Sequence, residues 1–561
     1  MDEPTAEPRP PERGAASRTE PSALRQIRES AQALIEQGKV DEAWELFVSA
    51  LEAVLVKNRE LELLVAKLRR ERIGTKSERI DPAQMRLLFD ALMDQGGGVQ
   101  VQVDPEVEAK EDAELDREIE SAEKAQPDPS GGRKRRKNEP GWQTRGVERR
   151  VHQVEVEAAQ QTCTACGREK TRMGFDVTRR LEYVPAHFVE HEYQLEKYAC
   201  GSCKEKVTTA PAPTQVLDRS AASASLLAHM VVSKYADHCP LHRLHRIYAR
   251  SGADIPVSTL SDWVAGVGDL IKPLVERLAE RVVAAHIVRT DATGLKVLDP
   301  QSPENIELGS VWAYIGDDRD VVFRYTPTGK GATGPWEFLA GRKGYIQADA
   351  SNVFDRLFNG RVTTAVELGC WSHARRRLVA LQDMDCRVAY PLKLIARLYR
   401  IEHLADARGL TPEGRAELRK ERSKPVLEKL KRWYLTTRTS EPPSTDLAKA
   451  AGYALNHWDA LTRFVDDGRV NLDNNLCEAQ LRDIALGRKN YLFAGSHDAA
   501  RRAAGLYSLT RTCAQYGVPP LAYFTDVLTK LANGWSMDRL DELLPHQWHL
   551  VTPTAENAQG P

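Results

Sequence analysis

The chain has 561 residues, of which 42% are hydrophobic and 28% charged, so it is long enough for several domains with apolar cores of their own. The formal net charge of −1 neither indicates nor excludes nucleic acid as a partner, because the charged residues are strongly clustered. No apolar run approaches the roughly 18 residues of a membrane span, and the polar N-terminal segment lacks the pattern of a signal peptide. We therefore expect a cytoplasmic protein with no membrane partner.

The N-terminal part is predicted to begin with a disordered segment, 1–20, and to continue as a helical segment, 21–95. Within the helical segment, residues spaced alternately by four and three form the a/d seam of a coiled coil. This seam consists of Phe47, Leu51, Val54, Asn58, Leu61, Val65 and Leu68. Asn58 at an a position favours a parallel dimer, so we expect a homo-oligomer. A single amphipathic helix packed on its own chain is the alternative.

Residues 96–141 are predicted to be a charged linker. They open with three glycines at 96–98, pass through an acidic block at 104–123 and end in a basic run at 133–137. Few large apolar residues are present, so the segment cannot bury a core of its own. The basic run either follows DNA phosphates or is a solvated tether, and both interpretations stay open.

Four of the nine cysteines form two C-x-x-C pairs in the segment 142–215: Cys163, Cys166, Cys200 and Cys203. In a reducing compartment such pairs indicate a metal rather than disulfides. Four thiolates complete a tetrahedral shell, which predicts one structural Zn²⁺ in a zinc-ribbon-like module, with strands expected between the pairs at 187–198. A redox pair or metal-free cysteines are the alternatives.

The segment 216–280 is predicted to be helical. Basic residues are concentrated at 235–250, and a helix is expected to begin with a cap at Ser258. A helix-turn-helix that binds DNA would have this composition. A helical subdomain that serves only packing is an equally good interpretation, because the spacing of a helix-turn-helix is a weak signal.

The segment 281–500 changes to short strands alternating with helices. From Ala285 the predicted order is β-β-β-α-β-α-β-α, which is typical of an RNase H-like core. Helix-forming sequence at about 376–465 is expected to be an insertion, and a helical tail at 501–561 follows. The predicted fold class is therefore α/β and multidomain.

Three acids stand out because of where the pattern places them. Asp291 and Asp349 each end a short apolar run, and Glu478 lies on a later helix. In the expected topology the two strand ends are neighbours, and three carboxylates are the minimum needed to hold two divalent cations for phosphoryl transfer. An Asp at a strand end is also a common turn or cap residue, the role expected of Asp299 and Asp355.

Basic residues accompany the three acids. His373, at the end of the fifth strand, is expected to donate to a scissile phosphate or a catalytic carboxylate. Arg375 and Arg376 follow it and are candidate DNA contacts. A buried cysteine, Cys370, with a capping histidine on a basic helix is the alternative interpretation of this segment.

The helix that carries Glu478 adds further candidates. Asp473 is expected to cap its start, and Arg482 lies one turn beyond Glu478 on the same face. Arg488 and Lys489, expected just after this helix, are candidate phosphate contacts.

The chain resembles the large transposase subunit of insertion-sequence family sixty-six, a group of bacterial DDE transposases. Besides the four-cysteine module, the resemblance is carried by motifs spread over nearly the whole chain. They are Leu68-Arg-Arg-Glu-Arg-Ile-Gly-Thr-Lys-Ser-Glu-Arg79, Lys234-Tyr-Ala-Asp-His-Cys-Pro-Leu-His-Arg243, Gly369-Cys-Trp-Ser-His-Ala-Arg-Arg376, the segment 473–496, Leu506-Tyr-Ser-Leu-Thr510 and Leu543-Leu-Pro-His-Gln-Trp548.

The resemblance implies DNA transposition on an RNase H-like core, with Asp291, Asp349 and Glu478 as the three catalytic acids. Two Mg²⁺ or Mn²⁺ ions, the terminal inverted repeats of an element, target DNA and small accessory proteins are the implied cofactors and partners. The chain departs from the family pattern after each acid, at Ala292, Ala350 and Ala479. A non-catalytic, zinc-containing DNA-binding protein derived from a transposase is the alternative, and the intact set of acids argues against it.

Overall fold

The structure, a computed structural model, describes residues 105–125, 207–327, 333–349, 352–358 and 362–549, together with short stretches between 149 and 199 and single positions elsewhere. The coiled-coil seam, the basic run at 133–137 and the cysteines Cys163, Cys200 and Cys203 lie outside the described residues. Within the described part, no helix combines the length and the apolar character needed to cross a membrane. The chain divides into two compact units, and each is described by itself.

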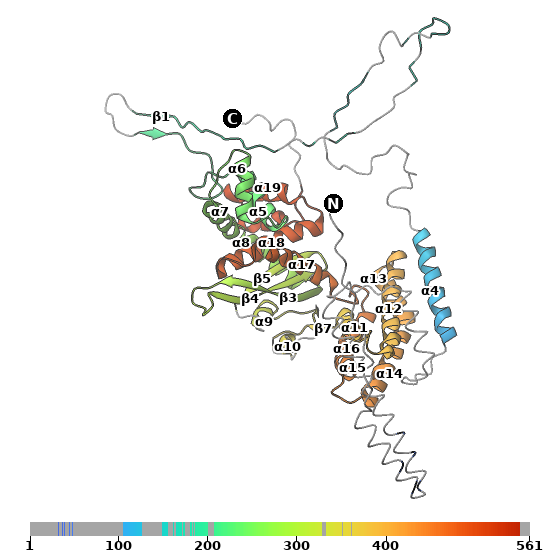
Figure 1. The fold of residues 1–561 in the computed structure, drawn as a ribbon. Coiled ribbons are helices and arrows are strands. Elements are labelled where there is room, and N and C mark those ends of the chain that lie inside the picture. Colours follow the sequence, from blue (N-terminus) through green and yellow to red (C-terminus); the bar gives the residue numbers. More distant parts are fainter. Residues whose placement is uncertain are drawn as a thin grey trace, which may run out of the picture. The chain divides into compact units, whose positions relative to one another are not determined.

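The second unit is built around one sheet of five strands in the order β5-β4-β3-β6-β7 (Figure 1). Strand β3 pairs antiparallel with β4 and parallel with β6, β4 pairs antiparallel with β5, and β6 pairs parallel with β7. The strands are β3 (Ile287–Leu298), β4 (Ile306–Gly316), β5 (Asp320–Thr326), β6 (Tyr345–Gln347) and β7 (Val366–Leu368). The architecture is therefore mixed α/β, with helices in the majority.

Three short helices separate the later strands. They are α9 (Thr333–Phe338), α10 (Asn352–Asp355) and α11 (Trp371–Val379). The order β-β-β-α-β-α-β-α predicted from the sequence is therefore observed. The lengths differ from expectation: β3 continues seven residues beyond Asp291 because it pairs with β4 as far as Leu298, so Asp291 lies within the strand and not at its end.

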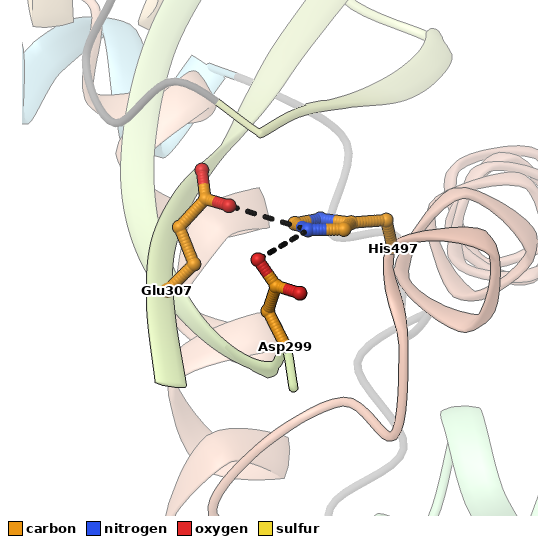
Figure 2. A group of neighbouring side chains, drawn as sticks. All are labelled: Asp299, Glu307 and His497. Carbon is orange, nitrogen blue, oxygen red and sulfur yellow. Dashed lines mark ion pairs between the residues drawn. The ribbon is translucent and has the colours of Figure 1, made fainter. Parts of the chain in front are cut away.

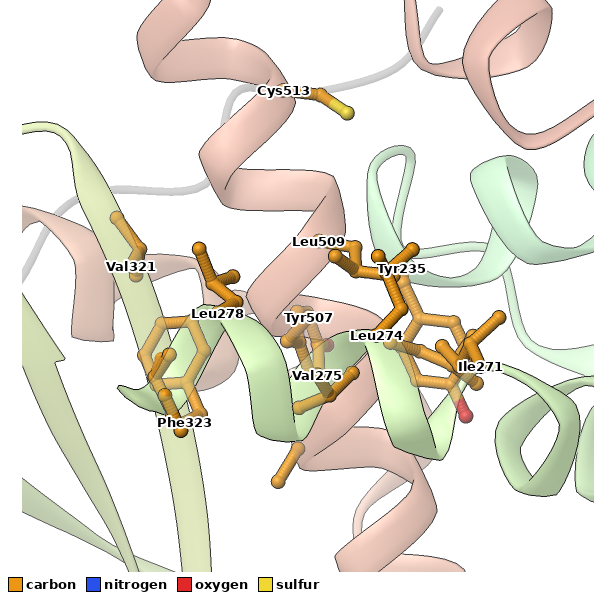
Figure 3. Close-up of a cluster of buried hydrophobic side chains, with 14 of the residues drawn as sticks. Tyr235, Ile271, Leu274, Val275, Leu278, Val321, Phe323, Tyr507, Leu509 and Cys513 are labelled. Carbon is orange, nitrogen blue, oxygen red and sulfur yellow. The ribbon is translucent and has the colours of Figure 1, made fainter. Parts of the chain in front are cut away.

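Helices that precede the strands in sequence and helices that follow them pack on the sheet. Helix α8 (Lys272–Ala284) and α18 (His497–Tyr516) contact β5, and α17 (Asn475–Tyr491) contacts β3 and β4. Figure 3 shows the apolar side chains of α8 and α18 meeting those of β5. The residues labelled on these three elements are Leu274, Val275, Leu278, Val321, Phe323, Tyr507, Leu509 and Cys513, all at most 4% exposed.

Strand β5 is an edge strand, and α18 supplies partners for its outward backbone groups. The amide of Val321 donates to Thr512 Oγ1 at 3.0 Å, and the amide of Phe323 donates to Ser508 Oγ at 2.8 Å. An unpaired backbone amide buried beneath a helix would be costly. Two hydroxyl residues one turn apart on α18 therefore allow the helix to lie against this edge.

The predicted helical segment is confirmed as four helices. They are α5 (Ala224–Tyr235), α6 (Leu241–Arg250), α7 (Val257–Leu270) and α8. The predicted cap at Ser258 is wrong: α7 begins at Val257 after Pro256, with no side-chain capping hydrogen bond. The fixed φ of Pro256 starts this helix in place of a polar cap. The last helical elements of the described residues are α19 (Pro520–Ala532) and a 3₁₀ segment, Met537–Leu543.

The helical insertion consists of α12 (Ala389–Ala407), α13 (Pro412–Leu418), α14 (Lys424–Ser440), α15 (Asp446–Asn456) and α16 (Trp458–Thr462). Its part in the second unit is organised by Arg419, which is fully buried. This guanidinium pairs with Glu402 at 2.7 Å and donates to the carbonyl oxygens of Phe464, Asp467 and Val470. In the first unit, Arg387 bridges Asp385 and Glu441.

The acidic part of the predicted linker is a helix, α4 (Pro105–Ala125). Composition alone predicts little structure there. The acidic side chains pair, however, with basic residues on α12, just after α12 and on α14. The predicted strands at 187–198 are shorter than expected. Among the described residues of that region, only β1 (Lys197–Tyr198) and β2 (Thr208–Thr209) pair, antiparallel.

Candidate active site

Asp291 lies within β3, and Asp349 lies two residues beyond the end of the neighbouring parallel strand β6. Arg289 of β3 is the register partner of Gln347 of β6, and each aspartate lies two residues further along its own strand direction. Adjacent strands lie about 4.8 Å apart where they pair, so the register brings the two backbones together two residues before each aspartate. The topology thus pairs segments that are 58 residues apart in sequence, the separation of Arg289 and Gln347.

Beneath the aspartates, Arg289 and Gln347 form a buried polar framework. Both side chains are fully buried and hydrogen-bonded to each other. Arg289 also pairs with Asp318 at 2.5 Å and donates to the carbonyl oxygen of Asp473 at 2.8 Å. Gln347 donates to the carbonyl oxygens of Gly369 and Asn471. The framework therefore ties β3 and β6 to the segment that leads into α17.

The start of α17 is fixed to the sheet by Asn474. Its side-chain amide donates to the carbonyl oxygen of Thr290 at 3.0 Å, and its backbone amide donates to Cys370 Sγ at 3.2 Å. Asn474, not Asp473, holds the N-cap position, which corrects the expected cap. The Asp473 carboxylate instead accepts from the amide of Asn475 at 3.1 Å and from the hydroxyl of Tyr399 at 2.8 Å.

Glu478 lies in the first turn of α17, one turn beyond the anchored Asn474. His373 of α11 approaches it, with Nε2 3.7 Å from Glu478 Oε1. Burial raises the pKa of the neighbouring Cys477 thiol well above its usual range, and the charges of Asp291 and Glu478 add to this effect. Helix α17 packs on β3 and β4, so Glu478 lies on a helix that contacts the strand carrying Asp291.

The protonation states of two neighbours follow from their burial. Burial raises the pKa of the Cys370 thiol to about 12, so it accepts the Asn474 amide as a neutral group. Burial, together with the charge of Asp473, also raises the pKa of Tyr399. Tyr399 consequently remains a hydrogen-bond donor to Asp473 throughout the physiological range.

A different set of side chains forms the tightest group of possible metal ligands. Among the described residues, Asp299, Glu307 and His497 are the group of three whose ligand atoms all lie within 4.8 Å of one another (Figure 2). His497 Nε2 lies 3.2 Å from Glu307 Oε2 and 3.8 Å from Asp299 Oδ2. The hydroxyl of Tyr325 is hydrogen-bonded to His497 Nδ1 at 2.9 Å. Gly309 leaves room for the Tyr325 ring, because a Cβ at this position would collide with it. Such a set could hold a divalent cation, but the ion pairs alone account for its arrangement.

The candidate DNA contacts differ in availability. Arg482 and Lys489 are exposed on α17. Arg488 instead donates to Thr293 Oγ1 at 3.1 Å and to the carbonyl oxygen of Gly294, so its guanidinium holds α17 against β3. Arg375 and Arg376 are partly buried on α11. A phosphate contact by Arg488 would compete with these contacts to β3.

The donor set of the four-cysteine module suits zinc, since two C-x-x-C pairs supply four thiolates. The described residues around the pairs show paired backbone. The amide of Lys170 donates to the carbonyl oxygen of Gln161 at 2.8 Å, which closes the chain around the first pair, and β1 and β2 flank the second pair in sequence. Cys166 is exposed, and the other three cysteines lie outside the described residues.

The framework residues Arg289, Gln347 and Asn474 were missed by the sequence analysis. The signal available for two of them is a polar residue within an apolar run, two positions before an aspartate, in Ile287-Val-Arg-Thr-Asp291 and again in Tyr345-Ile-Gln-Ala-Asp349. A buried polar side chain at the same place in both strands indicates a shared partner. Asn474 carries no comparable signal.

Comparisons with known proteins agree over the length of the chain. The family model described as "Transposase IS66 family" matches residues 219–502. The models "zinc-finger binding domain of transposase IS66", "IS66 C-terminal element" and "Transposase C of IS166 homeodomain" match residues 160–204, 508–546 and 60–145. The zinc-finger model thus includes all four cysteines of the two pairs.

Similar proteins occur in Sinorhizobium fredii. The uncharacterized protein y4hP is 32% identical over 87% of this chain and 88% of its own length. The uncharacterized proteins y4qI and y4jD are 33% and 31% identical over 68% and 71% of this chain. Because the first family model alone spans half of the chain and three further models of that family match around it, the chain belongs to the IS66 transposase family.

Proposed function

We propose that this protein catalyses metal-dependent DNA cleavage and strand transfer at the ends of an insertion sequence, on a sheet of the RNase H-like type. The observation that carries the proposal is the register of β3 with β6, which pairs the residues two positions before Asp291 and Asp349, with Glu478 on a helix anchored at the residue before Asp291. Three acids supplied by one strand, the end of a neighbouring strand and a helix would suit phosphoryl transfer.

Asp291, Asp349 and Glu478 would hold two Mg²⁺ or Mn²⁺ ions, since hard divalent cations prefer carboxylate oxygens. When bound, the ions would supply a charged environment that activates the attacking oxygen and stabilises the leaving oxygen. The chain's own residues would orient the acids for this chemistry. The Arg289–Gln347 framework and the Asn474 anchor fix the direction of the strands and of α17, and His373 is positioned to donate a proton or a hydrogen bond beside Glu478.

DNA is the proposed partner, both as element ends and as target. Arg482 and Lys489 are exposed on the helix that carries Glu478 and are the proposed phosphate contacts, with Arg375 and Arg376 on α11. The direct test incubates the full-length protein with a duplex bearing one end of its element and with a target plasmid. Joining of the 3′ end to the plasmid with magnesium, but not with a chelator, is expected. Equal joining in chelator would contradict the metal-dependent mechanism.

A non-catalytic DNA-binding role is the second candidate. The specific observation in its favour is that Asp299, Glu307 and His497, and not the three acids, form the compact ligand group among described residues. The same assay separates the two functions, because a purely binding protein would retain the duplex in a shifted complex without cutting it at any magnesium concentration.

Zinc is proposed to hold the four-cysteine module together. The purified, reduced protein is expected to contain about one tightly held zinc per chain, and Cys200→Ser is expected to remove it, because three thiolates leave the tetrahedral shell incomplete. Metal analysis by mass spectrometry measures the content. Cys239→Ser, a cysteine on the helical segment, is the control and should leave zinc unchanged. A zinc-free wild type would contradict the proposal.

Self-association is proposed to occur through the seam that includes Asn58. A fragment of residues 45–72 is expected to dimerise, and Asn58→Leu is expected to raise its thermal stability while mixing its oligomeric states, because the buried amide costs stability but fixes strand number. Sedimentation equilibrium measures both. A fragment that stays monomeric at high concentration would instead favour a helix that packs on its own chain.

A further inference from the structure

Helix α4 is strongly acidic and covers basic residues that follow it in the chain by nearly 300 positions. It carries nine acidic residues against three basic ones. Its acids pair with basic side chains of the helical insertion, all within the second unit. These partners are Arg397, Arg400, His403, Arg408, Arg422 and Lys429, which together are called the basic face.

Arg397 is the centre of this contact. It is 4% exposed and pairs with Glu108, Glu111 and Asp112 at 2.7–2.8 Å. Its guanidinium also donates to the carbonyl oxygen of Glu108. A guanidinium that satisfies its donors with several anionic oxygens is arranged as it would be around phosphate groups.

The rest of the contact is ionic and partly open to water. Glu118 pairs with Arg408 at 2.8 Å and with Arg422 at 3.2 Å, and Asp116 pairs with Arg400 at 2.6 Å. The apolar contribution of α4 is small, because Leu115 and Ile119 are its buried large apolar side chains. Half-exposed ion pairs are individually weak and are screened by salt. A competing polyanion could therefore displace α4 without unfolding an apolar core.

Three members of the basic face, Arg397, Arg400 and His403, lie on α12, which also reaches the candidate active site. Tyr399 of α12 lies between Arg397 and Arg400 in sequence, and its hydroxyl donates to Asp473, five residues before Glu478. Phosphates bound on the basic face would thus lie against the helix that supports the start of α17.

We propose that α4 is an internal acidic cover that occupies a phosphate-binding face of the insertion, and that the DNA backbone displaces it. The proposal rests on the proposed function in taking DNA as the partner. It does not require cleavage, so it is tested without added divalent cation and in the Glu478→Gln protein.

The test compares two double substitutions of the same residue type on α4. Glu111→Gln/Glu118→Gln removes acids that pair with the basic face, whereas Glu114→Gln/Glu120→Gln removes exposed acids for which no such pair is seen. Binding of a random-sequence duplex to the full-length protein is measured by fluorescence anisotropy at several salt concentrations. The first variant is expected to bind about five- to tenfold more tightly, with a steeper salt dependence of about 0.9 per added phosphate contact.

Equal gains in the two variants would overturn the proposal, because removal of negative charge alone would then explain them. A second measurement uses the unmodified sequence apart from Glu478→Gln, in case the first variant folds poorly. Hydrogen exchange of the amides of α4 is expected to speed up when the duplex is bound. Unchanged or slower exchange of α4 in the saturated complex would show that DNA does not displace it and would also overturn the proposal.

Discussion

Glu478→Gln is expected to lower strand transfer by more than about 100-fold. Mutating a residue that only hydrogen-bonds to a metal ligand already lowers metal affinity or activity by about 10- to 100-fold, and Glu478 is proposed as a ligand itself. The substitution keeps the size of the side chain and nearly its helix propensity, but it removes one negative charge from a site proposed to hold two divalent cations. Asp291→Asn and Asp349→Asn are expected to behave alike. The joined product of a labelled element end and a plasmid, quantified over time in magnesium or manganese, measures the loss.

Folding and DNA binding provide the controls for this prediction. Circular dichroism, thermal unfolding and the binding of element ends are expected to be nearly unchanged in Glu478→Gln. Asp355→Asn is the matched control, since Asp355 is exposed on α10 shortly after Asp349. Asp299 is unsuitable as a control, because its carboxylate faces His497. Near-normal strand transfer by Glu478→Gln would refute the assigned role.

Arg289→Met is expected to destabilise the second unit by about 3 kcal/mol, toward the lower end of the range for a broken buried ion pair, because Asp318 is partly solvated. The side chain of Asp318 is 37% exposed, whereas that of Arg289 is fully buried. The substitution removes the donors that Gln347 and the carbonyl group of Asp473 use. Urea unfolding followed by tryptophan fluorescence measures the loss, and strand transfer is expected to fall as well.

Two further variants distinguish a specific role of Arg289 from a general effect of losing an arginine. Arg289→Lys keeps the charge but cannot serve the three partners with one planar fork, so only partial recovery is expected. Arg319, the exposed arginine next to Asp318 in the turn between β4 and β5, provides the control. Arg319→Met is expected to change the free energy of unfolding by less than about 0.5 kcal/mol. If Arg289→Met unfolds at the same urea concentration as the wild type, the framework does not support the site.

The sequence predicts the order of strands and helices in the sheet segment because apolar periodicity is a local property. It also marks Asp291 and Asp349, since each follows a short apolar run. The extent of β3 was not predictable, because pairing with β4, and not the identity of its own residues, carries the strand past Asp291 as far as Leu298. Strand ends depend on the neighbour, and the neighbour is set by the fold.

Polar contacts between distant segments account for what the sequence analysis missed. The acidic block is a helix because its charges are neutralised by residues about 285 positions away, such as Arg397 opposite Asp112. Composition predicts a solvated linker when such partners are unknown. Arg488 is a similar case, because nothing local reveals that its guanidinium reaches Thr293 of β3.

The anchor between Asn474 and Thr290 joins residues 184 positions apart, with the whole helical insertion between them. Closing so long a loop costs chain entropy before any contact repays it, so this junction is expected to form late in folding. During synthesis the strands that carry Asp291 and Asp349 emerge long before the helix that carries Glu478. A nascent or prematurely terminated chain would therefore have made both aspartate-bearing segments while still lacking Glu478, so the proposed metal site would stay incomplete until the last part of the chain is made.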